Sequence, residues 1–199
     1  MPGKTEAEEL LAWGNDQNPG PWVKHSKAVA RAAQTIASKC GMDTHTAYTL
    51  GLLHDIGRYK GKMGIRHIYT GYTLMAGKGY HQPARICLSH SFPEKNYAAI
   101  YGENDCTKEE FEEITTKLNE YEYDDYDRLI QLCDSLCMAE GVCILEVRLM
   151  EVARRYNECN QAILNKWNAF FEIKKYFDNK CGTNIYSLFS EEIIKNSIN

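Results

Sequence analysis

Apolar residues recur along most of the chain at the three- and four-residue spacing of amphipathic helices, and alternating strand patterns are hard to find. The segment from Phe92 to Cys106 lacks this spacing and looks irregular, and the segment from Arg58 to Arg66 is a glycine- and lysine-rich loop. The pattern otherwise predicts helices over about 5–13, 21–40, 44–55, 67–77, 83–91, from 107 onward, 124–140, and one or two more up to about 179. We therefore expect an all-α fold.

Residues with known positional preferences mark several of the helix starts. Pro21 suits the first turn of a helix, and Asp43 or Thr44 can cap the N-terminus of the next one. The sequence Thr107-x-x-Glu110 resembles a capping box, in which two side chains satisfy free backbone N–H groups of the first turn. These signals place the helix boundaries independently of the apolar spacing.

The chain length of 199 residues suits one domain with a core large enough to fold without disulfide or metal staples. The expected core runs from about 21 to 140, where Gly141 stops the last core helix, and C-terminal helices follow from about 144 to 199. The tail after Gly182 predicts no definite element. Because the sequence contains no repeat, low-complexity segment or linker, we expect a single helical bundle over 1–199.

The net charge of the chain argues against one class of binding partner, extended nucleic acid. The chain has 23 Lys and Arg against 27 Asp and Glu, a formal net charge of -4. Binding to the backbone of extended nucleic acid needs a clustered positive surface, so we do not expect that function. A small phosphorylated substrate, such as a nucleotide, needs only a local basic patch and is compatible with this composition.

The sequence also favours a cytoplasmic location. The first residues are charged and lack the apolar core of a signal peptide, and no run approaches the 18 or so apolar residues of a membrane span. The eight cysteines are scattered rather than arranged as the framework of a short secreted chain. We expect reduced thiols and no membrane partner, and a homodimer is compatible with the sequence.

Four residues suggest a metal site. His54 and Asp55 lie side by side after two leucines, at the edge of the predicted core. Asp134 has apolar neighbours on most sides of its helix, and an ionised carboxylate is costly to bury unless it is paired or bound to metal. His25 lies near the apolar stripe of an earlier helix. Imidazole nitrogen with carboxylate oxygen suits Fe, Mn, Zn or Co rather than Ca.

This arrangement resembles that of the HD superfamily of metal-dependent phosphohydrolases. The order His25, then His54-Asp55 within LLHDIGR, then Asp134 matches the H…HD…D pattern that names the superfamily, and the likeness covers about Pro21 to Glu140. The resemblance implies a single HD-domain helical bundle in which these four residues hold a divalent metal. Fe is the first expectation, with Mn, Zn, Co or Ni as alternatives.

Two further histidines extend the resemblance. His67 and His90 lie between the His-Asp pair and Asp134, as in members that bind two metals. The layout is similar to that of HD-type symmetrical dinucleoside tetraphosphate hydrolases, which implies one or two ions. It departs from them after His90, where Ser91-Phe92-Pro93 replaces their usual Thr-Gly. The metal-site plan therefore carries over, but the substrate does not.

A bound metal would activate water for hydrolysis of a phosphate ester, by lowering the pKa of water from 15.7 to about 7. Asp55 is the catalytic candidate, because it can both ligate and accept a proton. Arg58 is a candidate for catalysis and for substrate binding, since it lies three positions after Asp55. Lys60 and Arg66 belong to the same basic segment and can also bind phosphate, although solvated side chains would explain them equally well.

Several other residues have simpler explanations. His45 and His81 are expected to be solvated. Four tyrosines near the site can stack on a base, but packing explains most of them: Tyr59, Tyr69, Tyr72 and Tyr80. The role of 92–106 stays open, although a loop of this length often lines or covers a pocket.

Two other functions remain open. Relatives with the same H…HD…H…H…D ligands hold a di-iron centre and activate oxygen instead of water, and the ligands alone do not separate the two chemistries. The third alternative is a non-catalytic HD domain that binds a nucleotide as a sensor. The full set of His25, His54, Asp55 and Asp134 argues against the sensor, because a protein that only binds nucleotide does not need these ligands.

Overall fold

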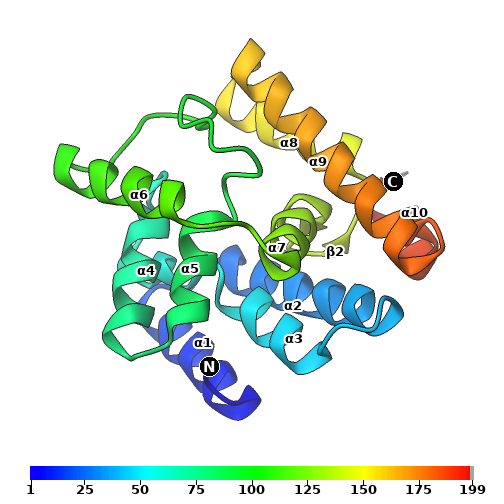
Figure 1. Ribbon diagram of the computed structural model, residues 1–199, viewed down its shortest axis with the longest axis horizontal. Helices are drawn as coiled ribbons and strands as arrows, with labels where there is room; N and C mark the ends of the chain where they lie inside the picture. Colours follow the sequence, from blue (N-terminus) through cyan, green and yellow to red (C-terminus); the bar gives the residue numbers. More distant parts are fainter. Residues whose placement is uncertain (198–199) are drawn as a thin grey trace.

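The computed structural model describes residues 1–197, which form ten α-helices, two 3₁₀ helices and one pair of short strands (Figure 1). The α-helices are α1 (Lys4–Gln17), α2 (Pro21–Lys39), α3 (Thr44–Leu53), α4 (Arg66–Gly77), α5 (His81–Ser89), α6 (Lys108–Glu120), α7 (Asp125–Leu136), α8 (Leu145–Tyr156), α9 (Gln161–Cys181) and α10 (Ser190–Ser197). The 3₁₀ helices are η1 (Ile56–Lys60) and η2 (Ile185–Phe189). Strand β1 (Cys137–Met138) pairs antiparallel with β2 (Gly141–Val142). The predicted all-α fold is confirmed.

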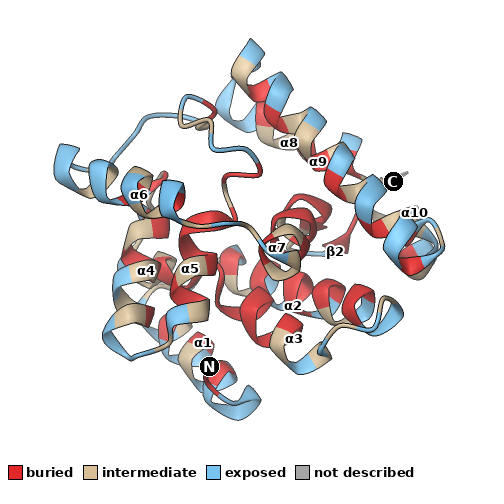
Figure 2. Ribbon diagram, viewed as in Figure 1, coloured by how far each residue is buried: buried red, intermediate tan, exposed pale blue. Residues whose placement is uncertain are grey.

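Helix α2 lies at the centre and packs against α3, α7 and α9. Burial is concentrated on α2, α3 and α7 and on the inward side of α5 (Figure 2). The approach of α3 to α2 depends on Gly51, where an added Cβ would lie 2.8 Å from the Cα of Ala30. This close contact brings the residue after α3, His54, to within 5.3 Å of the His25 ring, measured between ring centroids.

A second close contact joins η1, α4 and α5. A Cβ at Gly57 would lie 2.0 Å from the carbonyl oxygen of His67, and a Cβ at Gly71 would lie 2.9 Å from the Sγ of Cys87. Both positions therefore require glycine for packing. The result is that the first turn of α4 and the end of α5 lie directly against the His-Asp segment.

The irregular segment 92–106 is held by the C-terminal helices, and it runs from the end of α5 toward α8 and α9 before it returns to α6 (Figure 1). The Nε1 of Trp167 donates to the hydroxyl of Tyr101 at 2.7 Å, and the Gly102 N–H donates to Glu158 at 3.0 Å. The Lys166 Nζ donates to the carbonyl oxygen of Ala99 at 3.1 Å. The segment is thus an ordered strap attached to α9.

The helix expected over 124–140 ends earlier, at Leu136. Cys137 adopts an extended backbone conformation because it pairs with Val142 in the short hairpin. Gly141, which we expected to stop a helix, has a φ of 135° and lies in that hairpin. Within residues 1–197 this two-stranded hairpin is the one departure from helical secondary structure, and it replaces the end of the predicted helix.

Other boundaries also differ from the expectation. Helix α1 continues to Gln17, because Gly14 packs inside the core, where an added Cβ would lie 3.1 Å from both Ile56 and Trp22. The 58–66 loop begins with η1, and the tail after Gly182 forms η2 and α10. The two capping boxes, at Thr107 and at Asp124, open α6 and α7.

No helix within residues 1–197 combines the length and apolar composition that a bilayer crossing requires.

Candidate metal centre

The six side chains expected to bind metal come together from five helices. They are His25 on α2, His54 and Asp55 after α3, His67 on α4, His90 after α5 and Asp134 on α7. Their ligand atoms fall into three overlapping groups, each within 4.8 Å: His25, His54 and Asp55; His54, His90 and Asp134; and Asp55, His67 and His90. The cluster therefore has potential metal-binding side chains on two sides of Asp55.

One side of the cluster is built around Asp134. The Nε2 of His25 lies 2.8 Å from Oδ1 of Asp134, and the Nε2 of His54 lies 3.6 Å from the same oxygen. His54 Nε2 is also 3.9 Å from Oδ2 of Asp55. Two imidazole nitrogens and two carboxylates thus face a common point.

The other side is built around Asp55. Its Oδ1 lies 3.0 Å from Nε2 of His67 and 3.7 Å from Nε2 of His90. The two Nε2 atoms are 3.4 Å apart. Asp55 faces both sides, as a carboxylate that bridges two ions would.

Backbone carbonyls fix the orientation of three of the rings. The Nδ1 atoms of His54, His67 and His90 lie 2.7, 2.5 and 3.1 Å from the carbonyl oxygens of Gly51, Gly64 and Ile86. An Nδ1–H that donates to a carbonyl leaves the Nε2 lone pair free for a metal. All three rings therefore present Nε2 to the interior of the cluster.

Two atoms of the cluster are buried without a hydrogen-bond partner among the described residues: Nε2 of His54 and Oδ1 of Asp55. A buried polar atom left unpaired costs about 1–3 kcal/mol, so proteins rarely retain one without a function. Both atoms are good ligands for a divalent transition metal. The residues present therefore fit a metal ion.

The protonation states of the clustered side chains are also those that metal binding requires. Burial alone would raise the pKa of Asp55, but Arg58, His67 and His54 hold it well below its usual range. Burial would likewise raise the pKa of Asp134, and the neighbouring His25 and His54 hold it well below its usual range. Burial lowers the pKa of His90 to about 3. At neutral pH both carboxylates are therefore ionised and His90 is neutral, which are the forms that bind metal.

Of the three predicted substrate-binding cations, the structure brings only Arg58 to the cluster. Its Nε donates to Oδ2 of Asp55 at 2.6 Å, and its side chain is 29% exposed. Lys60 is exposed and lies over the ring of Tyr59. The guanidinium of Arg66 pairs instead with Glu110 on α6, at 2.7 Å. The basic segment therefore does not act as one patch.

The remaining candidates fall outside the cluster. His45 and His81 are exposed, as predicted. The hydroxyls of Tyr69 and Tyr80 donate to Glu113 and Glu6, while Tyr72 packs against apolar clusters. These contacts agree with packing rather than with binding of a base.

One residue near the cluster was missed from the sequence. Lys166 on α9 is only 8% exposed, and the negative charge of Asp134 acts on its pKa. A signal was available, because Lys166 lies three residues after Ile163 and four before Phe170, within the apolar stripe of its helix. A lysine at such a position needs a reason to be buried.

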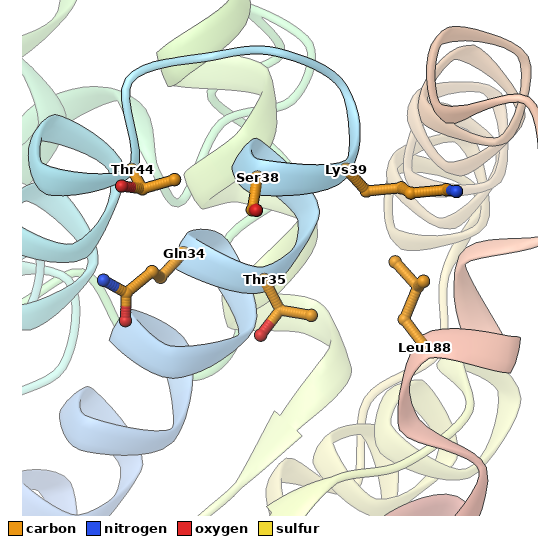
Figure 3. Close-up of a pocket in the computed structure, with 6 residues that line it drawn as sticks. All are labelled: Gln34, Thr35, Ser38, Lys39, Thr44 and Leu188. Carbon is orange, nitrogen blue, oxygen red and sulfur yellow. The ribbon is translucent and has the colours of Figure 1, made fainter.

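A surface pocket of about 590 Å³ lies elsewhere, at the C-terminal end of α2 (Figure 3). It is lined by Gln34, Thr35, Ser38, Lys39, Thr44 and Leu188. Thirteen residues of helix separate Ser38 from His25, a distance of about 20 Å. The pocket therefore belongs to a different part of the molecule from the His/Asp cluster.

Comparison with known proteins assigns the fold. The model of the HD domain family matches residues 22–139, a range that contains all six clustered side chains. Among solved structures, the chain is similar to the HD domain of the phosphodiesterase PgpH from L. monocytogenes, with 16% sequence identity and a TM-score of 0.47. That likeness covers 91% of this chain and 97% of the other. The chain belongs to the HD domain family and is an HD-domain hydrolase, and its buried His/Asp cluster is suited to binding a divalent metal.

Proposed function

We propose that this chain hydrolyses a nucleotide or another small phosphorylated substrate in a metal-dependent reaction. The observation that carries the proposal is the pair of unpartnered buried ligand atoms, Nε2 of His54 and Oδ1 of Asp55. They lie in a ligand set of four imidazoles and two carboxylates. Nitrogen and oxygen ligands of this kind suit Fe first, with Mn, Zn, Co or Ni as alternatives.

The distances support two ion positions that share Asp55. One ion would be held by His25, His54, Asp55 and Asp134, and the other by Asp55, His67 and His90. Bound ions supply Lewis-acid polarisation of phosphoryl oxygens and lower the pKa of water. The protein supplies the fixed positions of the ligands, because five helices and three backbone carbonyls hold them.

Asp55 and Arg58 would act directly on the reaction. The Asp55 carboxylate is ionised at neutral pH and can accept a proton from the attacking water. Arg58 keeps a permanent charge at the edge of the cluster and is partly exposed, so its free N–H groups can donate to a phosphoryl oxygen. Lys60 and Arg66 stay secondary candidates, because their side chains lie away from the ligands.

The test is anaerobic phosphate release by Fe(II)- or Mn(II)-loaded protein from mononucleotides, dinucleoside polyphosphates and phosphomonoesters. We expect Asp55→Asn to lower turnover at least about a hundredfold, since it removes both a ligand and a proton acceptor. Asp16→Asn is the matched control, because Asp16 is exposed and lies outside the cluster. It should retain wild-type turnover.

Three results would contradict the proposal. Stoichiometric O₂ consumption with a carbon-hydroxyl substrate, and no anaerobic phosphate release, would identify a di-iron oxygenase. Nucleotide binding without turnover under any metal would identify a sensor. Equal turnover by wild type and Asp55→Asn would show that hydrolysis does not occur at this cluster.

A further inference from the structure

Lys166 is a buried cation with few partners. Its Nζ lies over the rings of Phe92 and Tyr101 in the strap 92–106, at 5.9 and 5.4 Å from the ring centroids. An ammonium can donate three hydrogen bonds, and within residues 1–197 Nζ has one hydrogen-bond partner, the carbonyl oxygen of Ala99. Lys166 therefore has donor capacity that the described residues leave unused.

At close range the charge of Lys166 meets two aromatic rings rather than a carboxylate. No carboxylate in the described part of the chain forms an ion pair with it. Burial lowers the pKa of Lys166 to about 8, and the negative charge of Asp134 opposes the fall. The side chain is therefore still a cation at neutral pH, in a place where burying charge is unfavourable.

The strap does not need this charge to stay in place. Trp167 and Glu158 hydrogen-bond to the strap at Tyr101 and Gly102, and the Tyr101 and Tyr156 rings stack with centroids 5.7 Å apart. These contacts already fix the strap to α8 and α9. A lysine that served only to bind Ala99 would add one hydrogen bond at the cost of a buried ammonium.

Lys166 lies on the side where the ligand cluster opens. The side chain of Asp134 is 25% exposed, whereas that of His54 is fully buried and that of His90 is 2% exposed. Asp134 belongs to α7, which packs against α9. The strap starts at Phe92, two residues after His90, and its Ala99 carbonyl oxygen accepts a hydrogen bond from Lys166. The charge of Asp134 acts on Lys166, so Asp134 is the cluster residue that links the site to the region of Lys166.

We propose that Lys166 is a substrate-binding residue that donates to a phosphoryl oxygen of the substrate. This inference rests on the proposed phosphohydrolase function and names a contact for the same site. An anion that enters on the Asp134 side meets Arg58 at the cluster and Lys166 beneath the strap, so it is held by two cations carried by distant parts of the chain. An oxyanion also supplies the acceptor that Nζ lacks.

The test is calorimetric titration of Mn(II)-loaded protein with inorganic phosphate. We expect Lys166→Met to weaken phosphate binding at least about tenfold, because a charge-assisted hydrogen bond is lost, and Lys166→Arg to restore part of it. Lys175→Met is the matched control, since Lys175 is exposed on the same helix. Metal content should be equal in all four proteins.

A second measurement uses only the wild-type protein, in case the Met variant does not fold. Acetylation by acetic anhydride, followed by mass spectrometry, should be slowed at Lys166 by phosphate and unchanged at Lys175. Unchanged phosphate affinity in a folded, metal-loaded Lys166→Met protein, or no protection of Lys166, would overturn the inference. A different outcome separates the two proposals. If Lys166→Met loses phosphate binding while the wild-type protein hydrolyses no ester, the Lys166 contact is supported and the proposed reaction is refuted.

Discussion

At the scale of single residues, the cluster depends on which nitrogen each imidazole presents. His54, His67 and His90 each have Nδ1 against a backbone carbonyl three or four residues earlier, so the local helix geometry determines the ring orientation. Asp55 is the residue common to both sides. A substitution at one histidine should therefore affect one ion position more than the other.

We predict that His90→Ala lowers the metal content from about two ions per chain to about one. His90 contributes to the side of the cluster that contains His67, while His25, His54 and Asp134 remain for the other ion. Mass spectrometry on untagged protein measures this, with His81→Ala as a control because His81 is exposed. A content of about one ion in both wild type and His90→Ala would give His90 a structural role.

The sequence identified the clustered His and Asp side chains better than the residues around them. Two features are local and can be read from a short stretch of sequence. They are the adjacency of His54 and Asp55 and the apolar surroundings of Asp134. Which cation reaches the site is decided by contacts far along the chain. Arg58 and Arg66 look alike in the sequence, but Glu110, 44 residues later, binds Arg66. Lys166 lies 76 residues after His90, beyond any spacing rule that the motif supplies.

At the scale of secondary-structure elements, close backbone contacts place the ligands. The contact between η1 and α4 is tight enough that Gly57 has no space for a Cβ. Amphipathic spacing and capping signals predicted most helices, because both act within one element. They failed at Leu136, since the short hairpin at Cys137–Val142 depends on pairing between strands and on a glycine with positive φ.

We predict that Gly57→Ala lowers the free energy of unfolding by about 1–3 kcal/mol or more and reduces metal content. The added Cβ would meet the carbonyl oxygen of His67, so α4 must shift and carry His67 away from Asp55. Urea denaturation and mass spectrometry measure the two effects. Gly77→Ala, at the C-terminal end of α4, is the control, because the added Cβ meets no atom within 4 Å, and it should be neutral or stabilising by up to about 1 kcal/mol. Normal metal content in Gly57→Ala would show that α4 need not approach this closely.

The buried lysine of α9 predicts a pH dependence of stability. The pKa of Lys166 is lowered by burial to about 8 from an ordinary value of 10.5. Between these values the unfolded chain binds the proton and the folded chain does not, so stability rises with pH in this window. Between pH 8 and 10 the free energy of unfolding of the wild type should therefore rise relative to that of Lys166→Met, by at most about 1.4 kcal/mol per pH unit. Parallel stability curves from urea denaturation at each pH would contradict the lowered pKa.

At the scale of the whole molecule, five helices from the first two thirds of the chain meet at one cluster. A ligand that binds only the folded state stabilises it in proportion to the logarithm of its concentration over Kd. We predict that metal at about a thousand times Kd raises the free energy of unfolding by about 4 kcal/mol. Calorimetry with and without a chelator measures this.

Asp134→Asn should lose most of that stabilisation, whereas Asp16→Asn should keep it, because only Asp134 contacts the cluster. Identical unfolding transitions with and without metal, in wild-type protein, would mean that the cluster does not bind the ion tested.

The His/Asp cluster and the proposed anion-binding lysine come from different parts of the sequence. Every side chain of the His/Asp cluster lies within residues 22–139, whereas Lys166, which lies beside the strap, comes from a later stretch. If Lys166 binds the substrate as we propose, changes in that stretch will alter which anion is accepted and leave the His/Asp cluster intact, provided that core residues such as Phe170 and Phe177 are kept. Specificity in this architecture can therefore evolve, or be engineered, by exchanging the C-terminal helices on an unchanged reactive centre.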